Sequence, residues 1–127
     1  MAASIKNNSW LRFVWLWLPV AACMYIIFYA SSMSGKEVPE LFHFQDILFH
    51  GIIYGNLALL FLRAVKNTCP RLVFARMLLV TLVFSGLYAV SDELHQLFVP
   101  GRECSVFDLF IDLTGSFLGS LIGGKIL

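Results

Sequence analysis

The stretch that decides the fold is Leu72 to Phe98, which reads LVFARMLLVTLVFSGLYAVSDELHQLF. Its centre, Met77 to Val90, carries no charged residue, and the whole stretch exceeds the roughly 20 residues needed to cross a hydrocarbon core about 30 Å thick. Arg76 can extend to one interface while the polar end, residues 91–96, reaches the other. The pattern therefore predicts a transmembrane helix with one strongly polar end.

Three more apolar stretches flank this helix, at Phe13 to Ala30, Ile47 to Leu62 and Val106 to Ile122. The 127 residues are 59% hydrophobic and 13% charged, which is far from the balance of a soluble domain. We therefore expect an all-α polytopic membrane protein, a four-transmembrane-helix bundle in a single domain spanning residues 1–127. The predicted helices cover about residues 11–31, 46–64, 72–98 and 105–124.

The first apolar stretch is either a retained membrane helix or a signal peptide. It is longer than the roughly 7–15 apolar residues of a signal-peptide core, and it carries Trp15 and Trp17, so a retained helix is favoured. Cleavage near the small residues 30–32 is the alternative.

Basic residues lie mostly on one side of the predicted bundle. Because cytoplasmic loops hold an excess of Lys and Arg close to the helix ends, we place the N- and C-termini in the cytoplasm. Seven of the nine basic residues are then cytoplasmic, namely Lys6, Arg12, Arg63, Lys66, Arg71, Arg76 and Lys125. The acids all lie on the outer side, namely Glu37, Glu40, Asp46, Asp92, Glu93, Glu103, Asp108 and Asp112. Acids contribute little to topological sorting, so their segregation points to a function at the outer face.

Two function classes are disfavoured by composition. The cysteines Cys23, Cys69 and Cys104 are odd in number and far apart, which argues against a disulfide framework or a thiolate metal site. The formal net charge of +1 gives no basic footprint for a nucleic acid, and topology already accounts for the basic residues.

A first polar pattern combines Asp46, His50 and Tyr54 at successive four-residue steps, which places them on one helix face. Asp46 could accept a hydrogen bond from the imidazole of His50 and orient it as a general base or metal ligand. In the alternative reading Asp46 caps the helix, and His50 and Tyr54 join neighbouring helices.

A second polar group spans the end of the third predicted helix, the turn after it and the fourth helix. Pro100-Gly101 supplies the turn, and Arg102 lies where it could reach Asp108, Glu93 or an anionic head group. Ser105 and Asp108 have the spacing of a capping box, with Asp in place of the usual Glu or Gln. The group comprises Asp92, Glu93, His95, Gln96, Arg102, Ser105, Asp108 and Asp112. A structural alternative pairs Arg102 with Asp108 and leaves the other side chains solvated at the interface.

Gly115, Gly119 and Gly123 repeat every four residues along the fourth predicted helix. Small residues at this spacing allow helix backbones to approach closely. Asp108 and Asp112 share the face of Gly115 and Gly119, which should point toward the other helices. The glycines therefore predict a packing surface, either within the chain or between copies in a homo-oligomer.

Three of these motifs together resemble the VanZ-like family. They are Ser31-Ser32, Asp46-x3-His50-x3-Tyr54, and Ser91-Asp92-Glu93-x-His95-Gln96-x-Phe98-Val99-Pro100-Gly101-Arg102-x2-Ser105-x2-Asp108. The resemblance covers nearly the whole chain from Ser31 to the glycines, and the family's architecture is a multi-helix membrane protein. The family pattern commonly has Lys where this chain has Ile47, and Asn where it has Asp112. The first difference removes a basic contact and the second adds an acid.

The resemblance implies a bacterial envelope protein of the cytoplasmic (inner) membrane that contributes to glycopeptide resistance of the teicoplanin type. We expect it to contact the lipid bilayer and, at the outer face, to bind or modify an amphipathic, lipid-linked or glycopeptide ligand. Candidate catalytic residues are Glu93, His95 and His50. Candidate substrate-binding residues are Asp46, Tyr54, Asp92, Gln96, Arg102, Ser105, Asp108 and Asp112.

Whether the protein is an enzyme stays open, because the spacings match no hydrolase signature. They match no metal signature either, so no metal ligands and no cofactor are predicted, although Asp92 or Asp108 could bind a divalent cation. One alternative function is a non-catalytic scaffold of an envelope complex. Another is a small proton-coupled transporter with Asp112 and His50 as relay groups.

Overall fold

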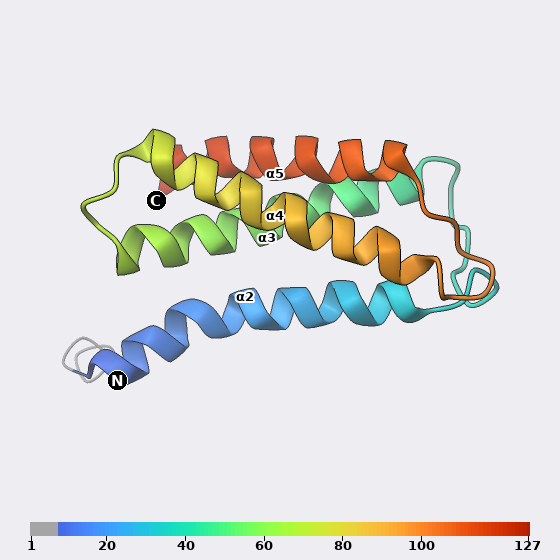
Figure 1. Cartoon of the computed structure of the whole chain (residues 1–127), viewed down its shortest axis with the longest axis horizontal. Helices are drawn as coiled ribbons and strands as arrows, with labels where there is room; N and C mark the ends of the chain where they lie inside the picture. Colours follow the sequence, from blue (N-terminus) through green and yellow to red (C-terminus); the bar gives the residue numbers. More distant parts are fainter. Residues whose placement is uncertain (1–7) are drawn as a thin grey trace.

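The computed structural model describes residues 8–127, and over that range it consists of four α-helices with no strand (Figure 1). The helices are α2 (Ser9–Ser32), α3 (Gln45–Thr68), α4 (Phe74–Gln96) and α5 (Val106–Ile126). Each is long and apolar enough to cross a membrane. The predicted all-α fold with four membrane-spanning helices is therefore confirmed.

Successive helices run in opposite directions, so the loops sort to two ends of the bundle (Figure 1). Loops 33–44 and 97–105, with the helix turns that adjoin them, form what we call the acidic end. The loop 69–73, the start of α2 and the end of α5 form the opposite, basic end. The basic end holds Arg12, Arg63, Lys66, Arg71, Arg76 and Lys125, whereas all eight acids belong to the acidic end. Lys6 lies outside the described residues.

The closest helix pair is α3 with α5, and glycines make that approach possible. A Cβ atom on Gly115 would fall on the carbonyl oxygen of Gly51, and one on Gly119 would fall on the carbonyl oxygen of Gly55. Two glycine pairs, each with four-residue spacing, thus face one another across the interface. Gly115 and Gly119 are used in packing within the chain, as one of the two readings of the sequence predicted.

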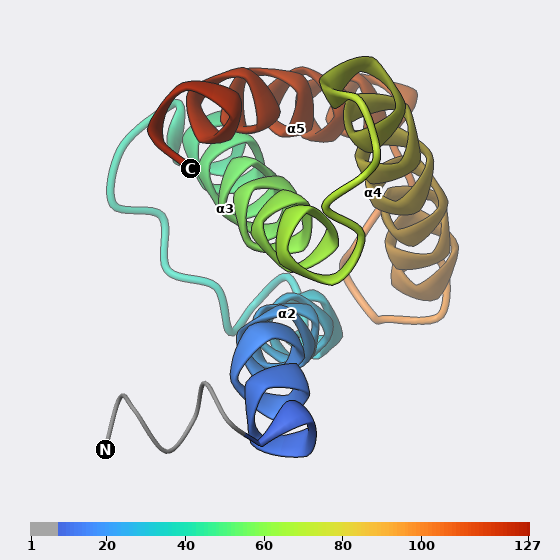
Figure 2. The same ribbon diagram turned by 90° about the vertical axis from the view of Figure 1, so that its left-hand side faces the viewer.

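Helix α2 packs against α3 and α4 but not against α5, as the view along the bundle shows (Figure 2). Its buried face repeats at helical spacing, with Leu16, Val20, Cys23 and Ile27 each at most 5% exposed. The other face of the helix remains apolar and exposed, as expected for a lipid contact. The first apolar stretch is therefore an integral part of the described bundle.

At the basic end, α3 continues four residues beyond its predicted end at residue 64. The indole N–H of Trp17 donates to the Thr68 hydroxyl at 3.2 Å, and the guanidinium of Arg63 lies 4.3 Å from the Trp15 ring centre. Arg63 and Lys66 therefore extend from a helix rather than from a loop, and their charges can reach the interface along their aliphatic stems.

At the acidic end the two long loops contact each other through glycine. The Gly35 N–H donates to the Pro100 carbonyl at 3.2 Å, and Gly101 has a φ of 74°, a conformation that side chains other than glycine rarely adopt. A Cβ atom on Gly35 would also collide with the Gly101 carbonyl. The turn at residues 100–101, which the sequence predicted, thus determines the backbone position of Arg102.

Candidate functional site

A cavity of about 460 Å³ opens at the acidic end, between the end of α2, the loop 33–44 and the first turns of α3. Most of its lining is apolar and includes Ile27, Leu41, Phe42 and Phe49. Its polar lining includes Ser31, Gln45, Asp46, His50, Tyr54, Asp92, Gln96 and Arg102. Apolar walls with a few converging polar groups are typical of sites for small molecules.

Tyr54 and Asp92 join α3 to α4 at the wall of this cavity. The Tyr54 hydroxyl donates to Asp92 Oδ2 at 3.2 Å, and the two residues are 1% and 7% exposed. Both were predicted to bind substrate, and both line the cavity. The hydrogen bond fixes the direction of the Asp92 carboxylate, whose second oxygen is left for another partner.

Arg102 contacts the end of α2 rather than an acid. Its Nε donates to the Met33 carbonyl at 3.1 Å and its Nη2 donates to the Ala30 carbonyl at 3.0 Å. Helix C-termini leave carbonyls without partners and favour positive charge, so Arg102 acts as a cap for α2. The ion pair with Asp108 that the structural alternative predicted is wrong, since within residues 8–127 the one ion pair joins His50 to Asp112.

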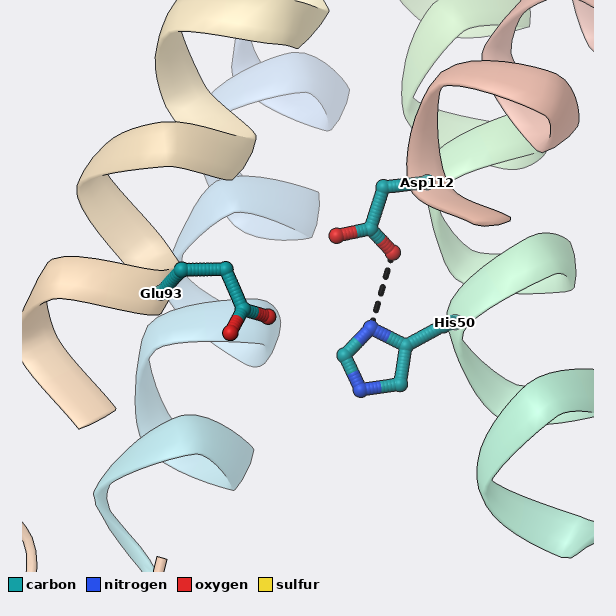
Figure 3. Close-up of side chains that lie close together, drawn as sticks. All are labelled: His50, Glu93 and Asp112. Carbon is teal, nitrogen blue, oxygen red and sulfur yellow. Dashed lines mark hydrogen bonds and ion pairs between the residues drawn. The ribbon is translucent and has the colours of Figure 1, made fainter. Parts of the chain in front are cut away.

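Three helices each contribute one side chain to a buried group behind the cavity wall (Figure 3). His50 of α3 contacts Asp112 of α5 through Nδ1 and Oδ1 at 2.8 Å, and Glu93 of α4 faces both (Figure 3). One nitrogen or oxygen from each residue lies within 4.8 Å of the other two. Exposure is 12% for the His50 side chain, 3% for Glu93 and 0% for Asp112. We call these three residues the buried triad.

The sequence pattern placed Asp46 as the carboxylate that orients His50, and the structure corrects this. The partner of His50 is Asp112, which lies 62 positions away in the chain. Asp46 lies in the first turn of α3, exposed, and the N-cap position belongs to Phe44. The shared helix face was nevertheless predicted correctly, because Asp46, His50 and Tyr54 all line the cavity.

Glu93 completes the cap of α5 in place of Asp108. The Ser105 hydroxyl accepts from the Asp108 N–H at 3.3 Å, as the capping-box spacing predicts. In a capping box the side chain three residues on would accept from the Ser105 N–H, but here that N–H donates to Glu93 Oε2 of α4 at 2.8 Å. Glu93 therefore ties α4 to the start of α5 with one oxygen, and its other oxygen lies within the buried triad.

His95 lies apart from the triad, on the side of α4 that faces α2. Its Nε2 is 2.9 Å from the Ser32 hydroxyl, and its ring stacks on Phe28 with the ring centres 4.8 Å apart. Neither His95 nor Glu93 belongs to the cavity lining, whereas Arg102 does. Glu93, His95 and Arg102 thus do not converge on one space, although an outer-face enzyme built on these three residues would need them to.

The arrangement offers two kinds of chemistry. The cavity can receive an apolar chain at its walls and a polar group near Arg102 and Gln96, the latter only 4% exposed. The buried triad offers one imidazole nitrogen and two carboxylates, which are the ligand types that divalent metal ions use. His50 belongs to both, because it lines the cavity and contacts Asp112.

Reasoning from the sequence missed the pairing of α3 with α5. The available signal was the spacing of Gly51 and Gly55 on α3, which matches that of Gly115 and Gly119 on α5. Gly51 follows His50 directly, and Gly115 is three residues after Asp112. Joining the two glycine pairs would have placed His50 near Asp112.

Comparison with known proteins gives one match. The family model described as VanZ/LLP1 matches residues 16–124, which covers all of α3 and α4 and most of α2 and α5. No curated protein and no solved structure matches the chain. Since the family match covers most of the chain and the bundle has four helices able to span a membrane, this multi-pass membrane protein belongs to the VanZ/LLP1 family.

Proposed function

We propose that the protein acts at the outer face of the bacterial cytoplasmic membrane, where the cavity at the acidic end holds an amphipathic or lipid-linked molecule of the cell envelope. The observation that carries the proposal is the mixed lining of the 460 Å³ cavity. Apolar side chains of α2, α3 and the loop 33–44 make most of it, and polar side chains of α2, α3 and α4, together with Arg102, make the rest. An amphipathic ligand matches both parts of such a lining.

The apolar part of the ligand would lie against the loop 33–44. Leu41 and Phe42 line the cavity and are also 79% and 52% exposed, and the neighbouring Phe44 is 62% exposed. Apolar side chains gathered on an exposed loop mark a contact with lipid or a ligand. This loop would therefore guide an acyl or prenyl chain from the bilayer into the cavity.

The polar part would lie near Arg102, the one basic residue among the cavity-lining residues. Its guanidinium contacts two backbone carbonyls, and no carboxylate of residues 8–127 neutralises it. An anionic group on the ligand would supply that charge with a charge-assisted hydrogen bond. Asp92 and Gln96 can bind hydroxyl or amide groups beside it.

The cellular consequence that we propose is lower susceptibility to teicoplanin-type glycopeptides. Such antibiotics are amphipathic, and the cavity that we propose for them or for a lipid-linked envelope molecule has both apolar and polar lining. A protein that binds either molecule at the outer leaflet would interfere with their encounter.

The test compares two substitutions of alanine by phenylalanine, one in the cavity lining and one outside the cavity. Ala30→Phe adds bulk to the cavity lining without removing a polar group, while Ala22→Phe makes the same change at an exposed position of α2. Each variant and the wild type would be expressed in a sensitive Gram-positive host at equal membrane abundance. We expect the wild type and Ala22→Phe to raise the inhibitory teicoplanin concentration several-fold, and Ala30→Phe to lose that effect.

Two results would count against the proposal. Full resistance with Ala30→Phe would show that the cavity does not hold the ligand. An unchanged inhibitory concentration with the wild type, correctly inserted in the membrane, would exclude teicoplanin resistance for this family member.

A further inference from the structure

We propose that His50, Glu93 and Asp112 form a binding site for one divalent transition-metal ion, with Zn²⁺ as the ion to test. The three side chains come from three different helices and point toward a common centre (Figure 3). One ligand atom from each lies within 4.8 Å of the other two. The inference does not rest on the amphipathic ligand proposed above, although His50 also lines the cavity.

The unpartnered oxygens of the two acids are the observation that points to an ion. Glu93 Oε1 and Asp112 Oδ2 are buried and have no hydrogen-bond partner among residues 8–127. Buried polar atoms normally find partners, because an unpaired one costs free energy and an unpaired carboxylate costs more. Two such atoms, on neighbouring side chains at least 97% buried, would both be satisfied by one shared positive partner.

The remaining oxygens hold the ligands in place. Glu93 Oε2 accepts from the Ser105 N–H, and Asp112 Oδ1 contacts His50 Nδ1. Glu93 is therefore fixed through one oxygen by a residue outside the triad and presents the other, which is how an outer contact orients a metal ligand. Asp112 is placed by its contact with His50. An ion between the three residues would replace the proton that joins His50 to Asp112.

The donor set matches a transition metal better than Mg²⁺ or Ca²⁺. One imidazole and two carboxylates suit Zn²⁺, Fe²⁺ or Mn²⁺, and for a given set of ligands Zn²⁺ binds more tightly than Mn²⁺ or Fe²⁺. Ligand atoms around Zn²⁺ lie about 3–3.5 Å apart, because each is about 2.0–2.2 Å from the ion. His50 and Asp112 are already in contact, and no two of the ligand atoms lie more than 4.8 Å apart. This limit is about 1.5 Å longer than in a zinc site, a difference that rotation of the long Glu93 side chain can close.

Access to the site runs through His50. Its side chain is 12% exposed and lines the cavity, whereas Glu93 and Asp112 are not among the lining residues. An ion entering from the cavity would meet the imidazole first and would keep any open coordination position on that side. A metal site needs such a route as well as its ligands.

The experiment measures Zn²⁺ binding to the purified, chelator-treated protein in detergent. Cys69→Ser and Cys104→Ser are introduced first, because both thiols are exposed and cysteine is a common Zn²⁺ ligand. We expect one Zn²⁺ per chain by calorimetry, and visible Co²⁺ absorption bands that Zn²⁺ abolishes. His50→Ala and Asp112→Asn should each weaken the affinity at least about tenfold.

His43→Ala is the matched control, because His43 is an exposed loop histidine outside the triad, and it should bind Zn²⁺ like the parent. Glu93→Gln is a second ligand variant that should keep its fold, since its amide oxygen can still accept from the Ser105 N–H. We expect it to remain monodisperse and to bind Zn²⁺ more weakly. Equal affinity in the parent and in folded His50→Ala or Glu93→Gln would overturn the proposal, as would a parent that binds no Zn²⁺.

Discussion

The two ends of the bundle differ in how deeply their charged side chains are buried. At the basic end, Arg12 Nη2 donates to the Asn67 carbonyl at 2.9 Å and Arg63 Nη2 donates to the Trp15 carbonyl at 3.0 Å. At the acidic end, Glu93 and Asp112 are buried between helices and each keeps one oxygen without a partner. Among the described residues, no basic residue of the basic end is fully buried, whereas three acids of the acidic end, Asp92, Glu93 and Asp112, are at most 7% exposed.

This contrast suggests different roles for the two ends, membrane anchoring for the basic end and binding for the acidic end. Basic and aromatic side chains at a helix end hold a protein at the membrane interface, and they need no further ligand. Acids placed inside a membrane bundle are costly, and proteins that keep them use them for pairing or binding. The acidic end is therefore where a functional interaction is expected, and the basic end is where the bundle is held in register with the bilayer.

The largest predicted effect concerns which end is outside. Cys104 is exposed at the acidic end and Cys69 is exposed at the basic end, so the chain carries a natural probe on each side. In intact cells of a Gram-positive host, a membrane-impermeant maleimide should label the wild type and Cys69→Ser but not Cys104→Ser. Permeabilised cells should label both single variants. Labelling of Cys104→Ser in intact cells would reverse the proposed orientation.

The second prediction concerns the contact between α3 and α5, which connects the two ends of the bundle. In Gly119→Leu the new side chain would occupy the position of the Gly55 carbonyl, and a backbone atom cannot move aside as a side chain can. Overpacking typically costs about 1–3 kcal/mol, and we expect this variant to reach the upper part of that range. Membrane abundance and thermal unfolding in detergent would report the loss.

Thr114→Leu is the control for Gly119→Leu, because it places the same leucine side chain at an exposed position of the same helix. It should accumulate like the wild type. Normal stability of Gly119→Leu would mean that α3 and α5 are not in close contact at this position.

The helices and the charge segregation were predictable because each depends on local pattern. Met77 to Val90 is uncharged over a length that lipid requires, and the four-residue spacing of the helix places Asp46, His50 and Tyr54 on one face. The cap at Ser105 is also a local feature, and the structure has it. Such features depend on residues within a few positions of one another.

The partners of the site residues were not predictable in the same way. Which carboxylate meets His50 depends on the register between α3 and α5, which the glycine pairs determine through contacts 62 or more positions apart. Arg102 contacts carbonyls at the end of α2, because the contact between Gly35 and the turn at residues 100–101 brings the two loops of the acidic end together. Local spacing contains no information on which helix lies opposite.

The third prediction tests how the acidic end holds α2. In Arg102→Ala the Met33 carbonyl loses its donor, and the Ala30 carbonyl keeps only the Met33 N–H. Hydrogen bonds from charged donors contribute about 1.5–3 kcal/mol each before screening, so a net loss of about 2 kcal/mol is expected for this partly exposed side chain. All three tryptophans, Trp10, Trp15 and Trp17, are in α2, so fluorescence-monitored unfolding reports directly on its docking. A wild-type melting curve would show that Arg102 does not hold α2.

The smallest effect is expected from the corresponding arginine at the basic end. Arg63 also donates to a carbonyl of α2, that of Trp15, and its guanidinium lies over the Trp15 ring. Arg63 makes one hydrogen bond of this kind where Arg102 makes two, and its stacked pair adds about 0.5–1 kcal/mol, so Arg63→Ala should shift the same fluorescence transition less than Arg102→Ala does. Teicoplanin susceptibility should separate the two further, since only Arg102 lines the cavity and only its loss should abolish resistance. If Arg63→Ala abolished resistance at normal membrane abundance, the distinction between an anchoring end and a binding end would be wrong.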